Sequence, residues 1–439
     1  MLSDTMIGLL CILGSLLLVQ SGLHIAIALM ALSFVGVGLI LNFQVAGKML
    51  ASSSISSISS YTFGVIPLFV IMGLIVGRTT IGRDLFAAAG QLLRGVMGGI
   101  GMATVAANAV FAACTGTSIA SASVFTRIAV PEMERMGYTT RFAVGVVGGS
   151  SILGMLIPPS LLFIVYGVVA NESIADLFVA GVIPGIVMAL AFCLCIIVLI
   201  VARPAFVFRD PSVGETHVAS ERMAVTGLFK ALVPVVVLVG VVIGGIYLGL
   251  FTPTEAGGVG ALAALVLGIT RREMSFPLLW DVALETGRVT AAIIFLLMAA
   301  QIYSQMLTLT GLPSTLNDWM TENNLSFMMF IIGYVVLLII MGTFLDSLSI
   351  MLIVVPFALE FLDGFGGNVI WFGVLTIVAV EIGLLTPPLG LSCFVIKANM
   401  DRPDVTVSDV FRGAFPFVIT MVLVLVLLIS WPWLSLALL

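Results

Sequence analysis

Apolar stretches long enough to cross a bilayer recur along the whole chain. A hydrocarbon core of roughly 30 Å is crossed by about 20 residues of helix, and a helix satisfies its own backbone groups there. Only 9% of the residues are charged, against about 25% in an ordinary soluble domain. We therefore expect an all-α integral membrane protein surrounded by membrane lipid. Because the net charge is only −5, nucleic acid is not an expected partner.

Residues 1–203 form the first of two similar series of segments. Spans are predicted near residues 5–20, 22–41 and 62–78, with a Ser-rich polar loop at 51–61 before the third. A short amphipathic arm helix is predicted at 82–94. A hairpin is predicted at 97–137, because its two apolar arms are joined by Thr115-Gly116-Thr117-Ser118-Ile119-Ala120-Ser121. This joint bends easily and carries no charge that would draw it into water, so the hairpin is predicted to be re-entrant.

A proline pair interrupts the next segment. The apolar run at 138–170 is too long for one span and contains Pro158-Pro159. Proline lacks a backbone donor and disfavours helix in the preceding residue, so we expect two half-helices that meet within the membrane. A last span near 175–202 leads to a polar loop at 204–230, which we predict to be cytoplasmic.

Residues 231–439 repeat this order of segments. Three spans lead to an arm helix at 312–323, a hairpin at 326–363 and a broken helix at 369–398. The tip of this hairpin is Gly342-Thr343-Phe344-Leu345-Asp346-Ser347, and the break contains Thr386-Pro387-Pro388. The sequence thus predicts two repeats of five spans, each with one re-entrant hairpin and one proline-broken helix.

The basic residues predict how the two repeats are oriented. With an odd number of spans in each repeat, the second repeat is inverted relative to the first, as in many secondary transporters. If the 204–230 loop is cytoplasmic, only Lys48 of the 17 basic residues falls on the outer side. This distribution agrees with the positive-inside rule, and the same tracing places both termini on the outer face.

The interruptions supply groups that bind ions and charged solutes. A backbone carbonyl freed at a tip or a break costs several kcal/mol in hydrocarbon if nothing satisfies it. Sodium is a hard cation that prefers oxygen ligands, and the N-terminal ends of half-helices attract a carboxylate. The residues predicted to bind sodium are Thr115, Gly116, Thr117, Ser118, Ser151, Gly154, Pro158, Gly342, Thr343, Asp346, Gly383 and Thr386. Those predicted to bind an organic anion are Ser118, Ser121, Ser150, Asp346, Ser347 and Arg127.

Three charged residues in these segments have alternative roles. Asp346 is the sharpest signal, because a carboxylate in a span costs roughly 2.5–3.5 kcal/mol on insertion scales. Either a sodium ion or a role as cap of the tip would offset that cost. Glu381 is a weaker signal, since a local partner or a water-filled crevice would also account for it. Arg127 either attracts the anion or extends toward the cytoplasm, and the second role is favoured.

Small residues at the tips have an alternative role in close helix packing. An enzyme is not expected, because no histidine stands near a nucleophile and no HExxH pattern is present. The five cysteines lie in apolar segments without ligand spacing, so neither a transition metal nor a cofactor is expected, with Na+ as the only coupling ion. A channel built on re-entrant loops is the main alternative, although two different tips favour alternating access.

Four motifs are the most specific parts of the sequence. They are Gly116-Thr117-Ser118-Ile119-Ala120-Ser121, Gly154-Met155-Leu156-Ile157-Pro158-Pro159-Ser160, Phe251-Thr252-Pro253-Thr254-Glu255-Ala256 and Leu385-Thr386-Pro387-Pro388-Leu389-Gly390. Together they resemble the large membrane subunit of tripartite ATP-independent periplasmic (TRAP) transporters. The resemblance covers essentially the whole chain.

The resemblance implies an elevator-type ion transporter of the bacterial inner membrane, driven by sodium. With the distribution of basic residues described above, both termini would then lie in the periplasm. It implies two partners, a small four-helix membrane subunit and a periplasmic substrate-binding protein. The family's substrates are mostly carboxylates, with sulfonates as an alternative, and nothing in this sequence selects among them. Hairpins, broken helices and last spans would move together, while 251–256 would belong to a static scaffold and begin a helix.

Overall fold

The computed structural model describes residues 3–59, 61–210, 225–323, 325–400 and 402–439. Within these ranges the chain forms helices and no named strand. The helices are α1 Asp4–Gln20, α2 Ile25–Ile40, α3 Phe43–Ser59, η1 Tyr61–Gly64, α4 Val65–Gly77, α5 Ile81–Leu92, α6 Gly99–Thr115, α7 Ser118–Arg135, α8 Thr140–Ser151, α9 Leu153–Leu156, α10 Leu161–Ala170, α11 Ile174–Ala202, α12 Pro204–Val207, α13 Val225–Tyr247, α14 Pro253–Thr270, α15 Phe276–Leu309, α16 Leu312–Glu322, α17 Phe327–Gly342, α18 Ser347–Gly364, α19 Val369–Leu384, α20 Leu391–Ala398, α21 Val407–Ser430 and α22 Trp433–Leu436.

Helix length and composition support a multi-pass membrane protein. Among the described residues, six helices are long and apolar enough to cross a bilayer, and up to eight if two bent pairs are counted. The bent pairs are α4 with α5, at 64°, and α8–α9 with α10, at 41°. The second pair is the predicted break at Pro158-Pro159, and α19 and α20 flank the predicted break at Pro387-Pro388. Both proline pairs contain a cis peptide bond.

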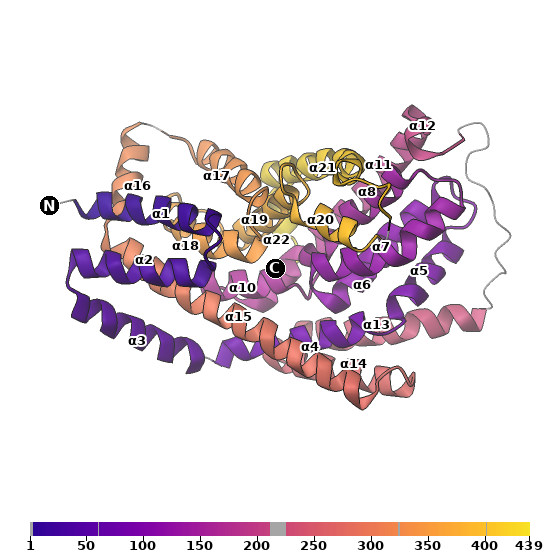
Figure 1. Ribbon diagram of the computed structural model, residues 1–439, viewed down its shortest axis with the longest axis horizontal. Coiled ribbons are helices and arrows are strands. Elements are labelled where there is room, and N and C mark those ends of the chain that lie inside the picture. Colours follow the sequence, from indigo (N-terminus) through magenta and orange to yellow (C-terminus); the bar gives the residue numbers. More distant parts are fainter. Residues whose placement is uncertain (1–2, 60, 211–224, 324, 401) are drawn as a thin grey trace.

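The helices pack in two groups, each of which draws on both halves of the chain. In the first group, α4 packs against α14, and α15 packs against α2, α3 and α4. In the second group, α8 packs against α21, α7 and α6, α19 packs against α17, α18 and α21, and α11 packs against α21. Figure 1 shows α3, α15, α4 and α14 along the lower side of the molecule and α17, α19, α20 and α21 along the upper side.

Two short amphipathic helices connect the groups. α5 follows α4 of the first group and packs against α6 and α7 of the second. It buries Ile81, Leu85 and Phe86 on one face, which is why a helix too short to span the membrane is stable here. α16 follows α15 and packs against α15, α18 and α1. The two arm helices predicted from the sequence are therefore present, at 81–92 and 312–322.

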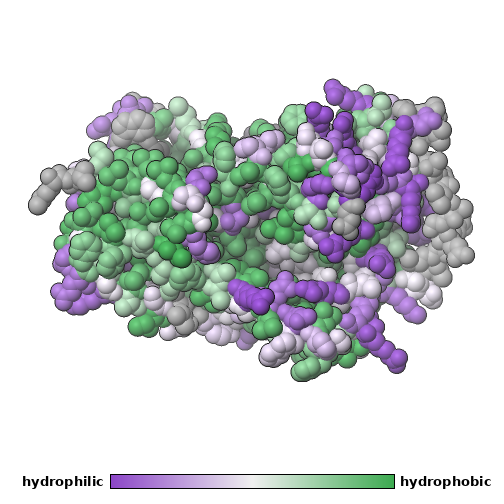
Figure 2. Space-filling model, viewed as in Figure 1, coloured by the Kyte–Doolittle hydropathy of each residue, from purple (hydrophilic) through white to green (hydrophobic). Residues whose placement is uncertain are grey.

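Hydrophilic side chains gather at one end of the molecule. Figure 2 shows them at the end where α7, α8 and α12 lie, whereas the surface over α1 and α2 is mostly hydrophobic.

The start of α14 agrees with its predicted cap. The Thr252 side chain accepts a hydrogen bond from the Glu255 N–H, and the Glu255 side chain accepts one from the Thr252 N–H. Pro253 occupies the first turn, where its missing N–H costs nothing.

Two predicted boundaries were wrong. The loop predicted at 204–230 is shorter, because α12 covers 204–207 and α13 begins at Val225; residues 211–224 lie outside the described ranges. The Ser-rich stretch at 51–61 was predicted to be a polar loop, but α3 covers it as far as Ser59. Its serines bond locally, as Ser52 and Ser54 donate to the Met49 and Leu50 carbonyls. A polar composition therefore did not prevent helix formation.

Candidate functional site

The first hairpin tip lies directly against the first helix break. Only Gly116 and Thr117 separate α6 from α7. Gly116 has φ +64°, which favours glycine, and a Cβ atom there would lie 2.9 Å from the Pro159 carbonyl oxygen. The Leu161 N–H donates to the Gly116 carbonyl at 3.1 Å. The predicted seven-residue bend was therefore too long, and Ser118 and Ser121 belong to the first turn of α7.

A second glycine allows this close contact from the other side. A Cβ atom on Gly154 in α9 would lie 2.7 Å from the Thr117 carbonyl oxygen. Gly154 and Pro158 are buried, and Thr117 is half-buried. The structure thus brings Gly116 and Thr117 against Pro159 and Gly154 through backbone atoms, and the predicted Pro158 is the neighbour of Pro159 in this break.

The second hairpin tip contacts the second break in the same manner. Residues 343–346 separate α17 from α18. A Cβ atom on Gly383 would lie 2.5 Å from the Gly342 Cα, so the two helices touch through their backbones. The Gly390 N–H donates to the Thr343 carbonyl at 3.4 Å. Each hairpin is therefore seated on the broken helix that follows it in the chain.

The two tips differ in how the helix after the tip is capped. Asp346 caps α18, accepting from the Ser349 N–H at 3.2 Å and from the Ser349 hydroxyl. By contrast, the Thr117 side chain makes no capping hydrogen bond at the start of α7 with any described residue. The N-terminal N–H groups and partial positive charge of α7 therefore remain available to an anion. Of the two alternatives for Asp346, the geometry shows the cap.

Ser118 joins the first tip to the second half of the chain. Its hydroxyl donates to Glu381 Oε1 of α19 at 3.4 Å. Ser118 is fully buried and Glu381 is 1% exposed. The other carboxylate oxygen, Oε2, has no hydrogen-bond partner in the described part of the chain. Glu381 was absent from the predicted ligands, although a carboxylate inside an apolar span was a visible signal for it.

A buried polar cluster holds the first hairpin to α8. Asn108 of α6 donates to the Ser150 hydroxyl at 2.7 Å, and the Ser121 hydroxyl donates to the Asn108 side-chain carbonyl. All three side chains are fully buried. Ser121 and Ser150 are thus brought together as predicted, through an asparagine that the prediction did not include.

The remaining predicted residues are four hydroxyl residues that bond within their own helices, together with Ser347 and Arg127. Four of them bond to carbonyls of their own helices, so their hydroxyl oxygens can still accept a contact: Thr115 to Phe111 at 3.2 Å, Ser151 to Gly148 at 2.8 Å, Thr343 to Ile340 at 2.8 Å and Thr386 to Ile382 at 2.7 Å. Ser347 is buried at the start of α18. Arg127 lies about 13 Å along α7 from Ser118 with an exposed side chain, so the structure does not bring it into the site.

The oxygen atoms at the tips and breaks suit a hard cation better than a soft one. The tips, the breaks and the adjoining helix α19 present backbone carbonyls, hydroxyls and the carboxylates of Asp346 and Glu381, and oxygen ligands of this kind suit alkali and alkaline-earth cations. The two cysteines nearest in sequence to the tip and the break, Cys114 and Cys393, are buried and free. The Cys393 thiol is positioned to donate to the Leu385 carbonyl at 3.8 Å.

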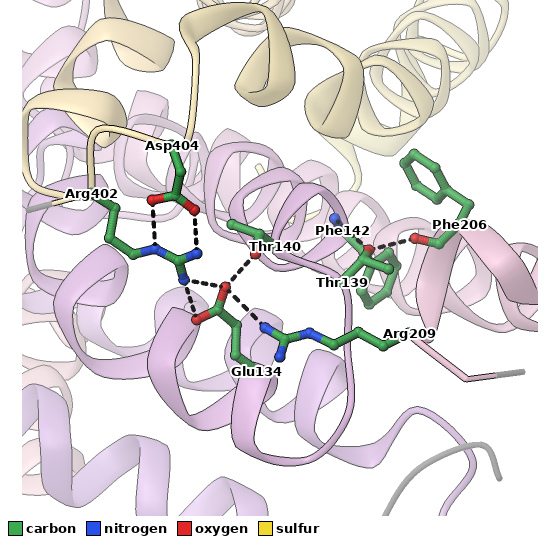
Figure 3. Close-up of polar contacts among 8 residues, drawn as sticks. All are labelled: Glu134, Thr139, Thr140, Phe142, Phe206, Arg209, Arg402 and Asp404. Carbon is green, nitrogen blue, oxygen red and sulfur yellow. Dashed lines mark hydrogen bonds and ion pairs between the residues drawn. The ribbon is translucent and has the colours of Figure 1, made fainter.

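An ion-pair network fixes the far end of the first hairpin (Figure 3). Both carboxylate oxygens of Glu134 accept from Arg402 at 2.9 Å, and Arg209 lies 3.4 Å from Glu134. Arg402 also pairs with Asp404. The hydrogen bond with Asp404 and the charge of Glu134 raise the pKa of Arg402, and Arg402 in turn holds the pKa of Asp404 below its usual value. The network joins α7 to the loops before α21 and after α12.

Similar proteins are large permease subunits. The chain matches the model of the DctM component of tripartite ATP-independent periplasmic transporters over residues 11–434. It is 33% identical over 393 residues to the C4-dicarboxylate TRAP transporter large permease protein DctM of Pseudomonas aeruginosa, covering 89% of each chain. It is 30% identical over 430 residues to the sialic acid TRAP transporter large permease protein SiaM of Vibrio cholerae, covering 97% of each chain.

A more distant relative and a solved structure agree. The isethionate TRAP transporter permease protein DctMQ of Oleidesulfovibrio alaskensis is 29% identical over 382 residues, which are 86% of this chain and 58% of that one. The YdaH transporter of Alcanivorax borkumensis has a TM-score of 0.62 at 12% identity, covering 88% of this chain and 89% of that one, and it supports the fold alone. The resemblance found in the motifs is confirmed, and the chain belongs to the DctM-component family of tripartite ATP-independent periplasmic transporters.

Proposed function

We propose that this protein imports an organic anion across the bacterial inner membrane by sodium-coupled secondary active transport. One observation carries the proposal: two hairpin tips, each seated backbone to backbone on a helix break, flank a buried serine–carboxylate contact between the two halves of the chain. Interrupted helices at membrane depth are stable where bound ions and a polar solute satisfy the freed backbone groups.

The anion would bind at the start of α7. The uncapped N–H groups there attract negative charge, and Ser118 and Ser121 lie in the same first turn. A carboxylate suits this arrangement, in keeping with relatives named for C4-dicarboxylates and sialic acid. A sulfonate presents oxygens of the same charge and is the alternative, because one relative is named for isethionate.

Sodium would bind where the tips meet the breaks. Carbonyls and hydroxyls of Gly116, Thr117 and Gly154 line one contact, and those of Gly342, Gly383 and Thr386 line the other. An ion held there would keep each tip in the shape that binds the anion. Ion and anion binding would then favour each other, which is the thermodynamic basis of coupling.

An elevator movement would carry the site across the membrane. We propose that the second helix group moves along the first as one body, with α5 and α16 as the arms. A cavity of about 520 Å³ already separates parts of the two groups, with Ser56 and Phe63 on one side and Gly167, Glu172 and Pro356 on the other. The ion-pair network at Glu134 would keep the hairpin attached to its own group during the movement.

Orientation and repeat symmetry complete the proposal. The two halves would be inverted repeats, and the hydrophilic end of the molecule would face the cytoplasm. Both termini would be periplasmic, in keeping with the position of the N-terminus at the opposite end in Figure 1. A small four-helix membrane subunit and a periplasmic substrate-binding protein would complete the transporter. The exposed Trp280 and Phe276 of α15 suit a lipid or subunit contact.

Reconstituted uptake tests this proposal. The chain would be placed in liposomes with its small membrane subunit, and the cognate binding protein would be loaded in turn with succinate, sialic acid or isethionate. We expect saturable accumulation of one anion above its external concentration, only with an inward sodium gradient. A choline gradient of equal ionic strength is the control. Flux that does not saturate and ignores the gradient would instead indicate a channel.

A further inference from the structure

We infer that Glu381 and Ser118 are ligands of a coupling cation bound between the first hairpin tip and α19. This inference rests on the proposed sodium-coupled function and extends it in two ways. It adds a carboxylate to the ligand set, and it places one ion at the junction of the two halves of the chain.

The charge of Glu381 is the first step of the argument. Its side chain is 1% exposed and its Oε2 has no hydrogen-bond partner among the residues described. Within the described part of the chain its hydrogen-bond partner is the Ser118 hydroxyl, and no lysine or arginine forms an ion pair with it. A buried carboxylate with one weak partner is strongly unfavourable, so the group needs either a bound proton or a cation beside it.

The distance between the two oxygens is the second step. Ser118 Oγ lies 3.4 Å from Glu381 Oε1, which is longer than the 2.5–3.0 Å typical of a hydrogen bond between oxygens. Two oxygens that bind one ion at right angles, with bonds of about 2.4 Å as for Ca2+, lie about 3.4 Å apart. The pair is therefore spaced as two ligands of an ion of that size.

The site also explains why the ion and the anion would depend on each other. An anion at the uncapped start of α7 would lie close to Ser118 and thus to the Glu381 carboxylate. Two like charges repel strongly at low dielectric constant, so the anion would be excluded while Glu381 is uncompensated. A cation between them removes the repulsion. Sodium binding would then be a condition for binding the anion at this tip.

Sodium-dependent thermal unfolding of the purified full chain tests the inference without measuring transport. Unfolding temperatures would be measured as sodium chloride replaces choline chloride at constant ionic strength. We expect Glu381→Gln, which keeps the shape and removes the charge, to raise the sodium concentration for half-maximal stabilisation at least about tenfold. The matched control is Glu132→Gln, because Glu132 pairs with Arg135 in an exposed contact at the other end of α7.

The outcomes separate this inference from the proposed function. Equal half-maximal sodium concentrations in wild type and Glu381→Gln would overturn the inference and leave sodium coupling intact. No stabilisation of the wild type by sodium would remove the sodium coupling itself. Glu381→Gln could instead leave the sodium response unchanged and abolish a pH dependence of stability. The Glu381 carboxyl group would then bind a proton and not sodium, which also overturns the inference. Should Glu381→Gln not fold, Ser118→Ala is expected to weaken the sodium response, and an unchanged response would contradict the cation site.

Discussion

Replacing Gly154 by alanine perturbs the contact between the first tip and the first break. The new Cβ atom would lie 2.7 Å from the Thr117 carbonyl oxygen and 3.1 Å from the Ser118 nitrogen. The first distance is about 0.7 Å short of ordinary van der Waals contact at 3.4 Å. Because both neighbours are backbone atoms, no side chain can rotate away. The tip itself must move.

The size of the effect follows from this overlap. Overpacking of a well-packed interior costs about 1–3 kcal/mol. A shift of about 0.7 Å also exceeds the tolerance of roughly 0.5 Å for a binding constellation. If the sodium-bound state bears the whole cost, sodium affinity falls roughly 5- to 150-fold. We expect insertion into the membrane to continue, since the hydrophobicity of the segment hardly changes.

Sodium titration of thermal stability and sodium-driven uptake measure this loss together. Gly287→Ala in α15 is the matched control, because no atom lies within 4 Å of its new Cβ. That control is expected to leave sodium dependence unchanged and to stabilise the protein by about 0.4–1 kcal/mol. A Gly154→Ala protein with the sodium affinity and stability of the wild type would refute the idea that the tip is seated on the break.

Substitutions at three further residues probe individual contacts. Asp346→Asn keeps the cap of α18 and should retain uptake, whereas Asp346→Ala should lower the free energy of unfolding by about 1 kcal/mol and impair uptake. An equal loss of uptake in the two variants would show that the charge of Asp346 itself is needed. Ser150→Ala leaves the Asn108 amide without its buried partner and should cost about 1–3 kcal/mol in chemical unfolding, so a neutral effect would contradict the cluster. Because Arg402 lowers the pKa of Asp404, the wild type should be more stable than Asp404→Asn above pH 3.8 and lose that advantage as the pH falls through the folded-state pKa, and a pH-independent difference would argue against the pair.

Much of the architecture could be predicted from the sequence, because membrane helices are specified locally. Twenty apolar residues form a span whatever surrounds them, and a proline pair ends a helix through its own missing donor. The sequence therefore predicted the helix breaks at Pro158 and Pro387. It also predicted the hairpins that turn near Gly116 and Gly342. The motifs at these same positions indicated the family as well.

The roles of individual side chains required the tertiary structure. Ser118 and Glu381 stand 263 positions apart, and no spacing rule connects a tip in one half to a helix in the other. Asp346 caps its own helix while Thr117 leaves α7 uncapped, a difference set by how each chain segment enters its helix. The sequence alone determined where the helices are interrupted, because the interruption is a property of the local backbone. Only packing decided which buried oxygens face each other, since that depends on how two distant halves come together.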